Sequence, residues 1–570
     1  MNSLILIILL ILLFNLNEIT FSTTTEESID QPTRILRAPR PIDRPREYAY
    51  FDDTIRRYRI ESRVDGFFLE SNMLPSPNRV SMFTIDNPTH SCRRVGINLE
   101  FQLEDDNNNN DGDIFRDITE NIKSIYLGKS QNVTSDIYVV ELAILNDMFD
   151  DIFHNDSGII EDAYSITIDH HVVKITSHSA NGIIYGLHTF GQLLQFEEDT
   201  SLYKLCRLPI HIHDKPFKNH RAIHLDTSTK FIPTSKFINF INQMGTLKLN
   251  YLHWKPFDFR NAQQLDLFNN NNNNNVKNIN NIDDKYKKND IQLIINQLKI
   301  NGIKLILEIP LFETIDIPNN SDKVIFNSAY NLNNSKINQT CLYILNPIDI
   351  EFNQTKEILN LFLSHFQNHD LNNLVYINIG EDKINYLDRL IACLSSMNES
   401  SLGNKNPIQY IEYLRENIVK YLREKGIELI IYPEERQNLY DLSFFDEKIL
   451  IQHNHKSKSY KNIHKHPDQS IFTLEINEII KERDKDVTRE IWEYVYNDLK
   501  FIYEMPMWIG GEILMTSEWL DRQDYAIGPP AAALSERLWT NPNTLQSNAY
   551  LLEERIIKFN ERNKLHAQQK

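Results

Sequence analysis

Strand-like and helix-like segments alternate from residue 220 onward, and this alternation limits the possible folds more than any other feature of the sequence. Eight short segments rich in Ile, Leu and aromatic residues favour β-strand, namely residues 221–225, 249–254, 304–309, 375–379, 427–432, 449–452, 471–476 and 508–515. Helical spacing of apolar residues appears between most of them, for example at residues 234–245, 291–298, 408–424 and 531–538. Eight alternating units of this kind close into a barrel of parallel strands. We therefore predict a (β/α)8 (TIM) barrel over residues 217–570.

A smaller domain is predicted before the barrel, because a chain of 570 residues has room for two or more domains. Residues 165–176 alternate in the manner of a β-hairpin, and residues 179–194 have the pattern of an amphipathic helix. Residues 73–216 are therefore expected to form a small α+β domain. The asparagine-rich run at residues 269–275 is interpreted as a disordered loop insertion in the barrel.

The N-terminal segment indicates export. Residues 4–14 form an unbroken apolar run of 11 residues, which is too short to span a bilayer and is typical of a signal peptide. We predict a signal peptide over residues 1–22 and a disordered, Arg/Pro-rich leader over residues 23–72. No second apolar run is long enough for a membrane span, so we expect a protein of the secretory pathway, lysosomal or secreted. The net charge of −18 gives no sign of a nucleic-acid partner.

Export is compatible with disulfide bonds and N-glycosylation. The four cysteines Cys92, Cys206, Cys341 and Cys393 could form two disulfides in three alternative pairings, or could be buried thiols. We favour a Cys341–Cys393 bond, because it would brace the loops around the strand at residues 375–379. Acceptor sites for N-glycosylation occur at Asn132, Asn155, Asn319, Asn333, Asn338, Asn353 and Asn398.

Four histidines raise the question of a metal. His170 and His171 form one close pair in the sequence and His211 and His213 another, but no spacing repeats with a carboxylate partner. We therefore expect neither a metal site nor a cofactor.

The strand at residues 375–379 ends in an unusual charged sequence. The run V-Y-I-N-I-G-E-D-K-I-N covers residues 375–385, and its three consecutive charges follow Gly380 directly. Active sites of TIM barrels lie at the C-terminal ends of the strands. This run resembles the catalytic strand [LIY]-H-[LI]-G-G-D-E-V of the glycoside hydrolase family 20 β-N-acetylhexosaminidases. In this alignment Asp382 falls on the family aspartate and Lys383 on the general-acid glutamate.

A shift by one residue would place Glu381 and Asp382 on the Asp-Glu pair of the family. That shift would also turn Ile377 and Ile379 to the opposite face of the strand, so we reject it. Three further segments carry the resemblance. Residues 220–228 (H-R-A-I-H-L-D-T-S) resemble H-R-G-L-L-L-D-T-S, residues 248–254 (K-L-N-Y-L-H-W) resemble K-L-N-x-x-H-W, and residues 510–512 with 533–539 resemble G-G-E followed by A-x-x-E-R-L-W. The helix pattern at residues 180–187 is similar to the A-x-G-x-x-Y-G-L helix of the small domain of the family.

The resemblance implies hydrolysis in which the 2-acetamido oxygen of a terminal N-acetyl-β-hexosamine attacks C1. An aspartate orients the acetamido group, a neutral glutamic acid protonates the leaving oxygen, and arginine, carboxylate and tryptophan side chains hold the sugar. Asp382 keeps the acetamido-orienting position. Asp258 and Glu518 keep two family carboxylates that bind substrate.

Other positions depart from the family pattern. The general acid is Lys383, the arginine of D-T-S-R is Thr229, and the two tryptophan positions are Tyr432 and Thr516. The histidine of the catalytic strand is Asn378, and the segment that matches E-x-D-x-P-G-H, residues 308–314, lacks its histidine. Barrel residues persist while site residues change together, which indicates relaxed selection on the chemistry.

Lys383 is a poor substitute for the general acid. An ammonium group can donate a proton, but its charge would oppose the positive charge that forms on the sugar. Loss of a positioned general acid lowers a rate by about 10²–10⁴-fold. Alternatively, Lys383 forms an ion pair with Asp382 or Glu381.

Two hypotheses remain open from the sequence. The first is a β-N-acetylhexosaminidase with altered catalytic residues that acts on glycoconjugates. The second is a non-catalytic homologue, either a partner subunit in a homo- or heterodimer with a paralogue or a protein that binds N-acetylhexosamine-bearing glycans.

Overall fold

The fold is taken from a computed structural model. It describes residues 73–82, 92–96, 98–103, 109–128, 136–137, 139–145, 154–155, 158–197, 199–256, 286–309, 311, 352–366, 373–380, 391, 395, 405–431, 449–454, 470–476, 491–499, 508–522, 527–541 and 552–559. All of them belong to one unit, Asp53–Lys570. The predicted divisions at residues 22 and 72 and the asparagine-rich insertion lie outside the described residues, and the division at residue 216 stays a prediction.

The smaller domain is built on a mixed sheet of six strands in the order β1-β11-β7-β8-β4-β3. The strands are β1 (Arg79–Met82), β3 (Glu100–Leu103), β4 (Val139–Ile144), β7 (Tyr164–Ile168), β8 (Val172–Ser177) and β11 (Ile210–Asp214). The predicted hairpin is confirmed, because β7 and β8 pair antiparallel with Ile166 opposite Ile175. Alternate residues of both strands are buried, as expected for a sheet with one face in a core.

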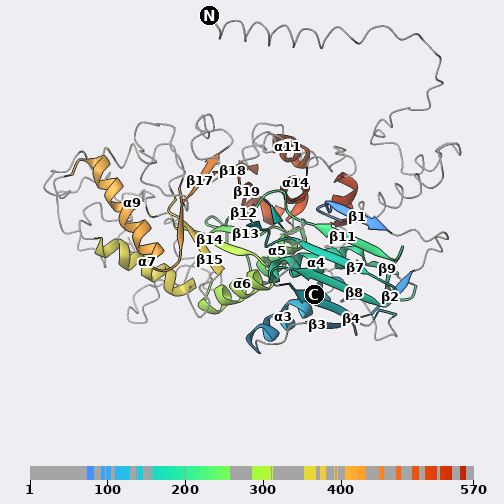
Figure 1. The fold of residues 1–570 in the computed structure, drawn as a ribbon. Coiled ribbons are helices and arrows are strands. Elements are labelled where there is room, and N and C mark those ends of the chain that lie inside the picture. The colour runs from blue at the N-terminus through green and yellow to red at the C-terminus, as the bar shows by residue number, and fades with distance from the viewer. Residues whose placement is uncertain are drawn as a thin grey trace, which may run out of the picture. The chain divides into compact units, whose positions relative to one another are not determined.

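Two helices accompany this sheet, α3 (Asn109–Tyr126) and α4 (Ala180–Leu193) (Figure 1). The predicted helix is α4, which begins after Ser179, whose side chain accepts a hydrogen bond from the Gly182 N–H. A Cβ atom at Gly182 would lie 2.0 Å from Ser177 Oγ and 2.4 Å from the Ala163 carbonyl oxygen, so the helix needs glycine there. Because α4 also packs on barrel helix α5 (Thr234–Thr246), nearly all its residues are buried.

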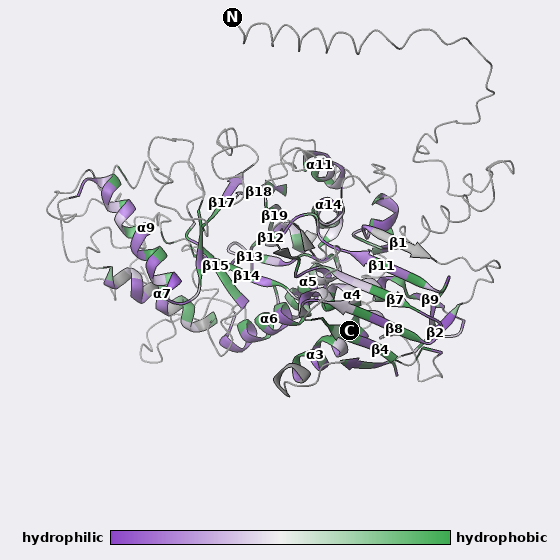
Figure 2. Cartoon of the chain, in the orientation of Figure 1, coloured by the Kyte–Doolittle hydropathy of each residue, from purple (hydrophilic) through white to green (hydrophobic). Residues whose placement is uncertain are grey.

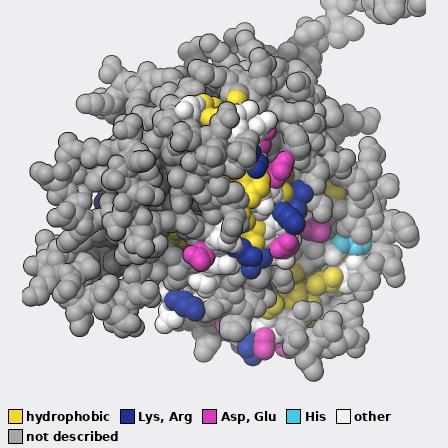
Figure 3. All heavy atoms as spheres, turned by 90° about the vertical axis from the view of Figure 1, so that its left-hand side faces the viewer, with side chains coloured by type: hydrophobic (Ala, Val, Ile, Leu, Met, Phe, Trp, Pro, Cys, Tyr) yellow, Lys and Arg dark blue, Asp and Glu magenta, His cyan; other side chains and the backbone are white. Residues whose placement is uncertain are grey.

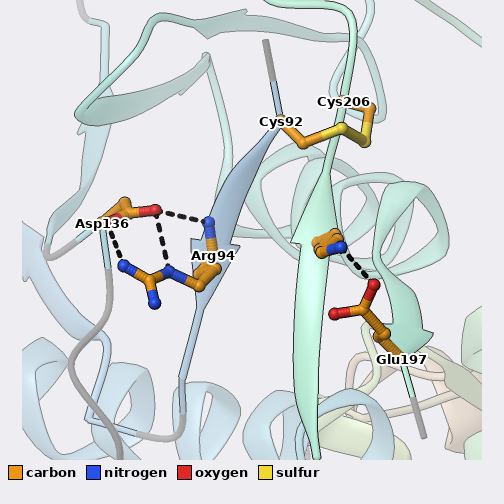
Figure 4. The surroundings of a disulfide bond; sticks show 6 residues. Cys92, Arg94, Asp136, Glu197 and Cys206 are labelled. Atoms are coloured by element: carbon orange, nitrogen blue, oxygen red, sulfur yellow. Dashed lines mark hydrogen bonds and ion pairs between the residues drawn. A yellow bond between two sulfur atoms is a disulfide. The ribbon is translucent and has the colours of Figure 1, made fainter. Parts of the chain in front are cut away.

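A disulfide joins Cys92 to Cys206 at one end of a second, three-stranded sheet (Figure 4). This sheet has the order β2-β10-β9, from β2 (Arg93–Val95), β10 (Leu202–Leu205) and β9 (Gln195–Glu197). A two-stranded sheet, β5 (His154–Asn155) with β6 (Gly158–Ile159), completes the described strands of this domain. Of the three pairings of four cysteines, only one contains Cys92–Cys206, and it also joins Cys341 to Cys393. Both of those residues lie outside the described part of the chain, so the Cys341–Cys393 bond stays a prediction.

Peptide mapping under non-reducing conditions tests this pairing. We expect one linked peptide pair that contains Cys92 and Cys206 and a second that contains Cys341 and Cys393. Alkylation of Cys341 or Cys393 in the folded, unreduced protein would contradict the prediction.

The predicted TIM barrel is confirmed. Eight parallel strands close in the order β12 to β19, and β12 pairs with both β13 and β19 (Figure 1). The strands are β12 (His220–Asp226), β13 (Tyr251–Lys255), β14 (Lys304–Glu308), β15 (Leu374–Asn378), β16 (Glu428–Ile431), β17 (Leu450–Asn454), β18 (Ser470–Glu475) and β19 (Gly510–Thr516). The barrel helices described besides α5 are α6 (Lys288–Ile300), α7 (Asn353–Phe366), α9 (Pro407–Arg423), α11 (Ile491–Asp498), α13 (Ser517–Arg522) and α14 (Gly528–Trp539).

Side chains of the barrel strands alternate between two environments. Outward-facing residues such as Ile223, Leu252 and Ile377 belong to the large apolar core between strands and helices. The strand colours in Figure 2 show the same mixture of apolar and polar positions. Because successive residues of a strand face opposite sides, the residues between them point into the barrel. Near the N-terminal ends of the strands this interior is apolar, with Ile306, Ile430, Leu450 and Ile471 packed together.

Buried polar contacts join the smaller domain to the bottom of the barrel. Lys248, in the loop before β13, donates to Asp214 Oδ2 at 2.8 Å and to the Tyr164 hydroxyl at 2.7 Å. The same carboxylate oxygen accepts hydrogen bonds from the Tyr164 hydroxyl at 2.6 Å and from Trp539 Nε1 at 2.8 Å. Arg221 donates to Asp162 at 2.7 Å, with its guanidinium 4.9 Å from the centre of a Trp539 ring. The motif residues Arg221, Lys248 and Trp539 therefore serve the domain contact.

The described surface shown in Figure 3 carries positive and negative side chains interspersed around apolar ones. Among the described helices, none combines the length and apolar composition that crossing a bilayer requires.

A buried histidine predicts how stability changes with acidity. His188 on α4 is fully buried, and burial together with the charge of Lys248 lowers its pKa to about 3. The unfolded chain, with a histidine pKa of about 6.5, binds this proton first. The contribution of the neutral imidazole is therefore complete above pH 6.5 and is lost as the pH falls toward 3.

We expect His188→Gln to remove this dependence. Between pH 7 and pH 4.5 the free energy of unfolding of the wild type should fall by about 2 kcal/mol more than that of the variant. Urea denaturation at the two pH values measures the difference. The exposed His171 gives the matched control, since His171→Gln should follow the wild type; equal pH dependence of His188→Gln and the wild type would contradict the prediction.

Candidate functional site

The C-terminal ends of β12 and β19 bring three predicted site residues together. The two strands are neighbours, with Asp226 opposite Thr516. Beyond them, Thr229 Oγ1 lies 3.5 Å from Ser517 Oγ, and Glu518 follows in the first turn of α13. Thr229, Thr516 and Glu518 therefore lie on one side of the barrel mouth, and their roles in binding stay predictions.

This side of the mouth offers short hydroxyl groups at the two positions where the resemblance predicts an arginine and a tryptophan. Thr229 is exposed and Thr516 is half-buried, and neither can provide the forked donor of an arginine or the flat surface of an indole. The adjacent cation, Lys230, is held in an ion pair with Asp521. Glu518 retains a carboxylate that can accept hydrogen bonds from sugar hydroxyls.

The remaining predicted site residues lie outside the described part of the chain. They are Asp258, Asp382, Lys383 and Tyr432. Of the predicted glycosylation sites, Asn155 and Asn353 are described, and Asn353 is exposed at the start of α7. Their roles stay predictions.

The strand that precedes Asp382 is fixed by a buried amide. Asn378, the last residue of β15, accepts a hydrogen bond from the Gly380 N–H at 2.8 Å. Its Nδ2 donates to Gln452 Oε1 at 2.9 Å. Gly380 has a φ of 76°, a conformation that favours glycine, so the chain turns there. Asn378 therefore sets where the backbone leaves the barrel just before Glu381.

A polar layer fills the barrel interior below the mouth. Gln452 Nε2 donates to Thr473 Oγ1 at 2.9 Å and also to Glu512. Thr473 donates to Glu512 Oε1 at 2.9 Å. The other members are His224, His253 and Glu308, and all six residues of the layer are buried. Residues this deeply buried do not reach a substrate at the mouth, so we place them outside the reacting site.

The titratable residues of this layer were not predicted from the sequence. His224, His253 and Glu308 lie inside the barrel. Glu308 forms an ion pair with Lys255, with Lys255 Nζ 3.0 Å from Glu308 Oε1. The signal that could have found them is the alternation of the strands, since each occupies an inward-facing position beside outward-facing apolar residues. His224 also departs from the family pattern, which has leucine at that place in residues 220–228.

Mutual charges control ionisation within the layer. Burial lowers the pKa of His224, but Glu308 and Glu512 outweigh it and raise that pKa to about 10. Burial and the neighbouring His224 lower the pKa of His253. Burial alone would raise the pKa of Glu308 and of Glu512. Lys255 and His224 instead hold the pKa of Glu308 below its usual value. His253, His220 and His224 lower the pKa of Glu512 in the same way.

The sequence of the barrel matches a known protein family. Residues 218–542 match the family described as "Glycosyl hydrolase family 20, catalytic domain". The chain is 24% identical over 404 residues to beta-hexosaminidase 3 of Arabidopsis thaliana, covering 68% of this chain and 69% of that protein. It is also 24% identical over 423 residues to beta-hexosaminidase subunit B2 of Dictyostelium discoideum, covering 68% of each.

Solved structures show the same fold. The exo-β-N-acetylglucosaminidase of Vibrio harveyi superposes with a TM-score of 0.59 at 16% identity, over 87% of this chain and 78% of that one. The β-N-acetylhexosaminidase of Bacteroides fragilis gives a TM-score of 0.58 at 17% identity, over 86% and 96% of the two chains.

Proposed function

The chain belongs to glycosyl hydrolase family 20, and on that premise we propose that it is a β-hexosaminidase homologue with little or no hydrolytic activity of its own. The observation that carries the proposal is the lysine at position 383, where the family has its general acid. Thr229 and Thr516 lie at the described side of the mouth, and the resemblance places there the arginine and tryptophan with which the family holds the sugar. An ammonium group and two short hydroxyls do not supply that chemistry.

The proposed ligands are glycans that end in N-acetyl-β-hexosamine. Asp382 stands at the acetamido-orienting position, while Asp258 and Glu518 keep two carboxylates for ring hydroxyls. Carboxylates can bind a sugar without cleaving it, because recognition needs hydrogen-bond acceptors and hydrolysis also needs the acid. Three carboxylates without the general acid are therefore consistent with a protein that binds the sugar but does not hydrolyse it.

A second function follows from the intact scaffold. The barrel is closed and makes buried contacts with the smaller domain, and the relative in Dictyostelium discoideum is described as a subunit. We propose, as this second function, that the chain acts as a partner subunit of an active paralogue. The apolar run at residues 4–14 supports export, and we place the protein in the secretory pathway.

The experiment is turnover of an aryl N-acetyl-β-glucosaminide by protein purified from a host without hexosaminidases. We expect a kcat/KM at least about 10²-fold below that of an active relative, the lower bound for loss of a general acid. Titration with N-acetylglucosamine tests whether binding remains. Robust turnover by the isolated chain would overturn the proposal, and activity that appears only on co-expression with a paralogue would support the subunit function.

A further inference from the structure

Two histidines are stacked inside the barrel between two buried carboxylates. His224 and His253 occupy paired positions on β12 and β13, and their rings lie 3.8 Å apart with planes 11° from parallel. On one side, His224 Nδ1 lies 3.5 Å from Glu512 Oε1, and His253 Nδ1 lies 3.3 Å from Glu512 Oε2. On the other side, the two Nε2 atoms lie 2.9 and 3.6 Å from Glu308 Oε2.

This arrangement has too few protons for its hydrogen bonds. A neutral imidazole carries one N–H, so two neutral rings would direct two nitrogen lone pairs at carboxylate oxygens. Both nitrogens of His224, Nε2 of His253 and both oxygens of Glu308 lack a hydrogen-bond partner of good geometry among the described residues. A proton on His224, which the two carboxylates favour, satisfies only one of these lone pairs. One ligand atom from each of His224, His253 and Glu512 lies within 4.8 Å of the others, a spacing at which a single cation can accept the lone pairs of both rings.

We propose that His224, His253 and Glu512 bind a divalent transition-metal ion of the zinc class through the two Nδ1 atoms and the Glu512 carboxylate. Two imidazoles and a carboxylate are ligands that zinc favours. Ligand atoms about 2.0–2.1 Å from a tetrahedral ion are about 3.3 Å from one another. Each Nδ1 lies near that separation from one oxygen of the Glu512 carboxylate, His253 at 3.3 Å from Oε2 and His224 at 3.5 Å from Oε1.

Glu308 has a defined part in this site. In the orientation that the rings have in the structure, both Nε2 atoms face Glu308 Oε2, on the side where a carboxylate can orient metal-bound histidines. Lys255, 3.0 Å from Glu308 Oε1, offsets the charge of that carboxylate. The nearly parallel rings must turn about their Cβ–Cγ bonds so that both lone pairs meet on one ion.

The site would be structural and independent of hydrolysis. Its ligands come from β12, β13 and β19, consecutive strands across the seam where the first and last strands close the barrel. All three side chains are at most 2 % exposed, so the ion would hold the seam from within. The motif that residues 220–228 resemble has leucine in place of His224, so the proposed site is not part of that motif.

Metal analysis of the purified full chain tests the proposal. After exposure to ZnCl2 and dialysis, we expect about one zinc per chain in the wild type and a fall in Tm on treatment with a chelator. His224→Leu restores the family residue, so it should fold, bind no zinc in the barrel and show no response of Tm to the chelator. His453→Leu removes another buried barrel histidine and should keep the zinc response.

Two results would overturn the proposal. One is folded wild-type protein that retains no zinc and shows no zinc-dependent change in Tm, which would assign the stack to a bound proton. The other is an unchanged zinc content and Tm response in His224→Leu, which would place the metal elsewhere in the chain. Neither result depends on glycosidase activity.

Discussion

Lys248→Met is expected to lower the free energy of unfolding by about 3–5 kcal/mol, the range for breaking a buried ion pair by removal of one partner. Lys248 is 1 % exposed and lies 2.8 Å from Asp214, and its ammonium is 4.4 Å from the centre of a Trp539 ring. Without it the Asp214 carboxylate would stay buried between the neutral donors Tyr164 and Trp539. Because these groups come from both domains, the loss should destabilise both together.

Chemical denaturation followed by circular dichroism measures this effect, and the chain supplies its own control. Lys230 and Asp521 also form a Lys–Asp pair, but the two side chains are 45% and 40% exposed. Lys230→Met should therefore change the free energy of unfolding by at most about 1 kcal/mol. A Lys248→Met variant no less stable than Lys230→Met would refute the argument.

A double variant separates the ion pair from other packing effects. Asp214→Asn removes the charge but keeps most of the shape, so on its own it leaves Lys248 buried and unpaired. In Lys248→Met/Asp214→Asn neither charge remains, and the loss should be smaller than the sum of the two single losses. Additive losses would mean that the charges do not interact as the distance indicates.

The barrel could be predicted because its signal is local. Alternating apolar residues identified all eight strands, and the errors are confined to their ends. For example, the strand predicted from residue 249 begins at Tyr251, because Lys248 has a φ of 56° and the Leu249 and Asn250 N–H groups bond to Met244 and Arg221. A left-handed residue that is not glycine leaves little trace in a sequence.

Contacts between distant segments could not be predicted in the same way. Alternation shows that His224 and Glu512 face inward, but only the closure of the barrel makes β12 and β19 neighbours. The Asp214 contacts join residues from the smaller domain, a barrel loop and the final barrel helix. Family motifs marked Arg221, Lys248 and Trp539 as constrained without indicating that their constraint is the domain contact.

The candidate site also contains residues that the sequence could predict and contacts that it could not. Thr229, Thr516 and Glu518 could be grouped because the motifs assign each to the end of a known strand, and β12 and β19 bring them to one side of the mouth. Asn378 was noted only as a missing histidine. Its contacts with Gly380 and Gln452 depend on the packed interior, which the sequence pattern of one strand does not specify.

Restoring the general acid alone is expected to give at most a trace of hydrolysis. Lys383→Glu would return a proton donor beside Asp382, and the neighbouring carboxylate should raise its pKa as the role requires. The sugar would still lack its clamp at Thr229 and its walls at Thr516 and Tyr432. Because the acetamido oxygen must be held in line with C1, a misplacement of about 1 Å can lower the rate roughly 10²-fold.

The triple variant Lys383→Glu/Thr229→Arg/Thr516→Trp should therefore gain more than the product of the separate gains, since groups that act as a unit are not additive. Thr229 is exposed and Thr516 is half-buried at the mouth. The measurement is kcat/KM on an aryl N-acetyl-β-glucosaminide for the wild type, the single variants and the triple variant. Lys230→Glu is the matched control, because it makes the same charge change at the exposed lysine next to Thr229. It should give no gain in kcat/KM. Full activity from Lys383→Glu alone would show that the clamp and walls are dispensable, and that the lysine by itself accounts for the lost chemistry.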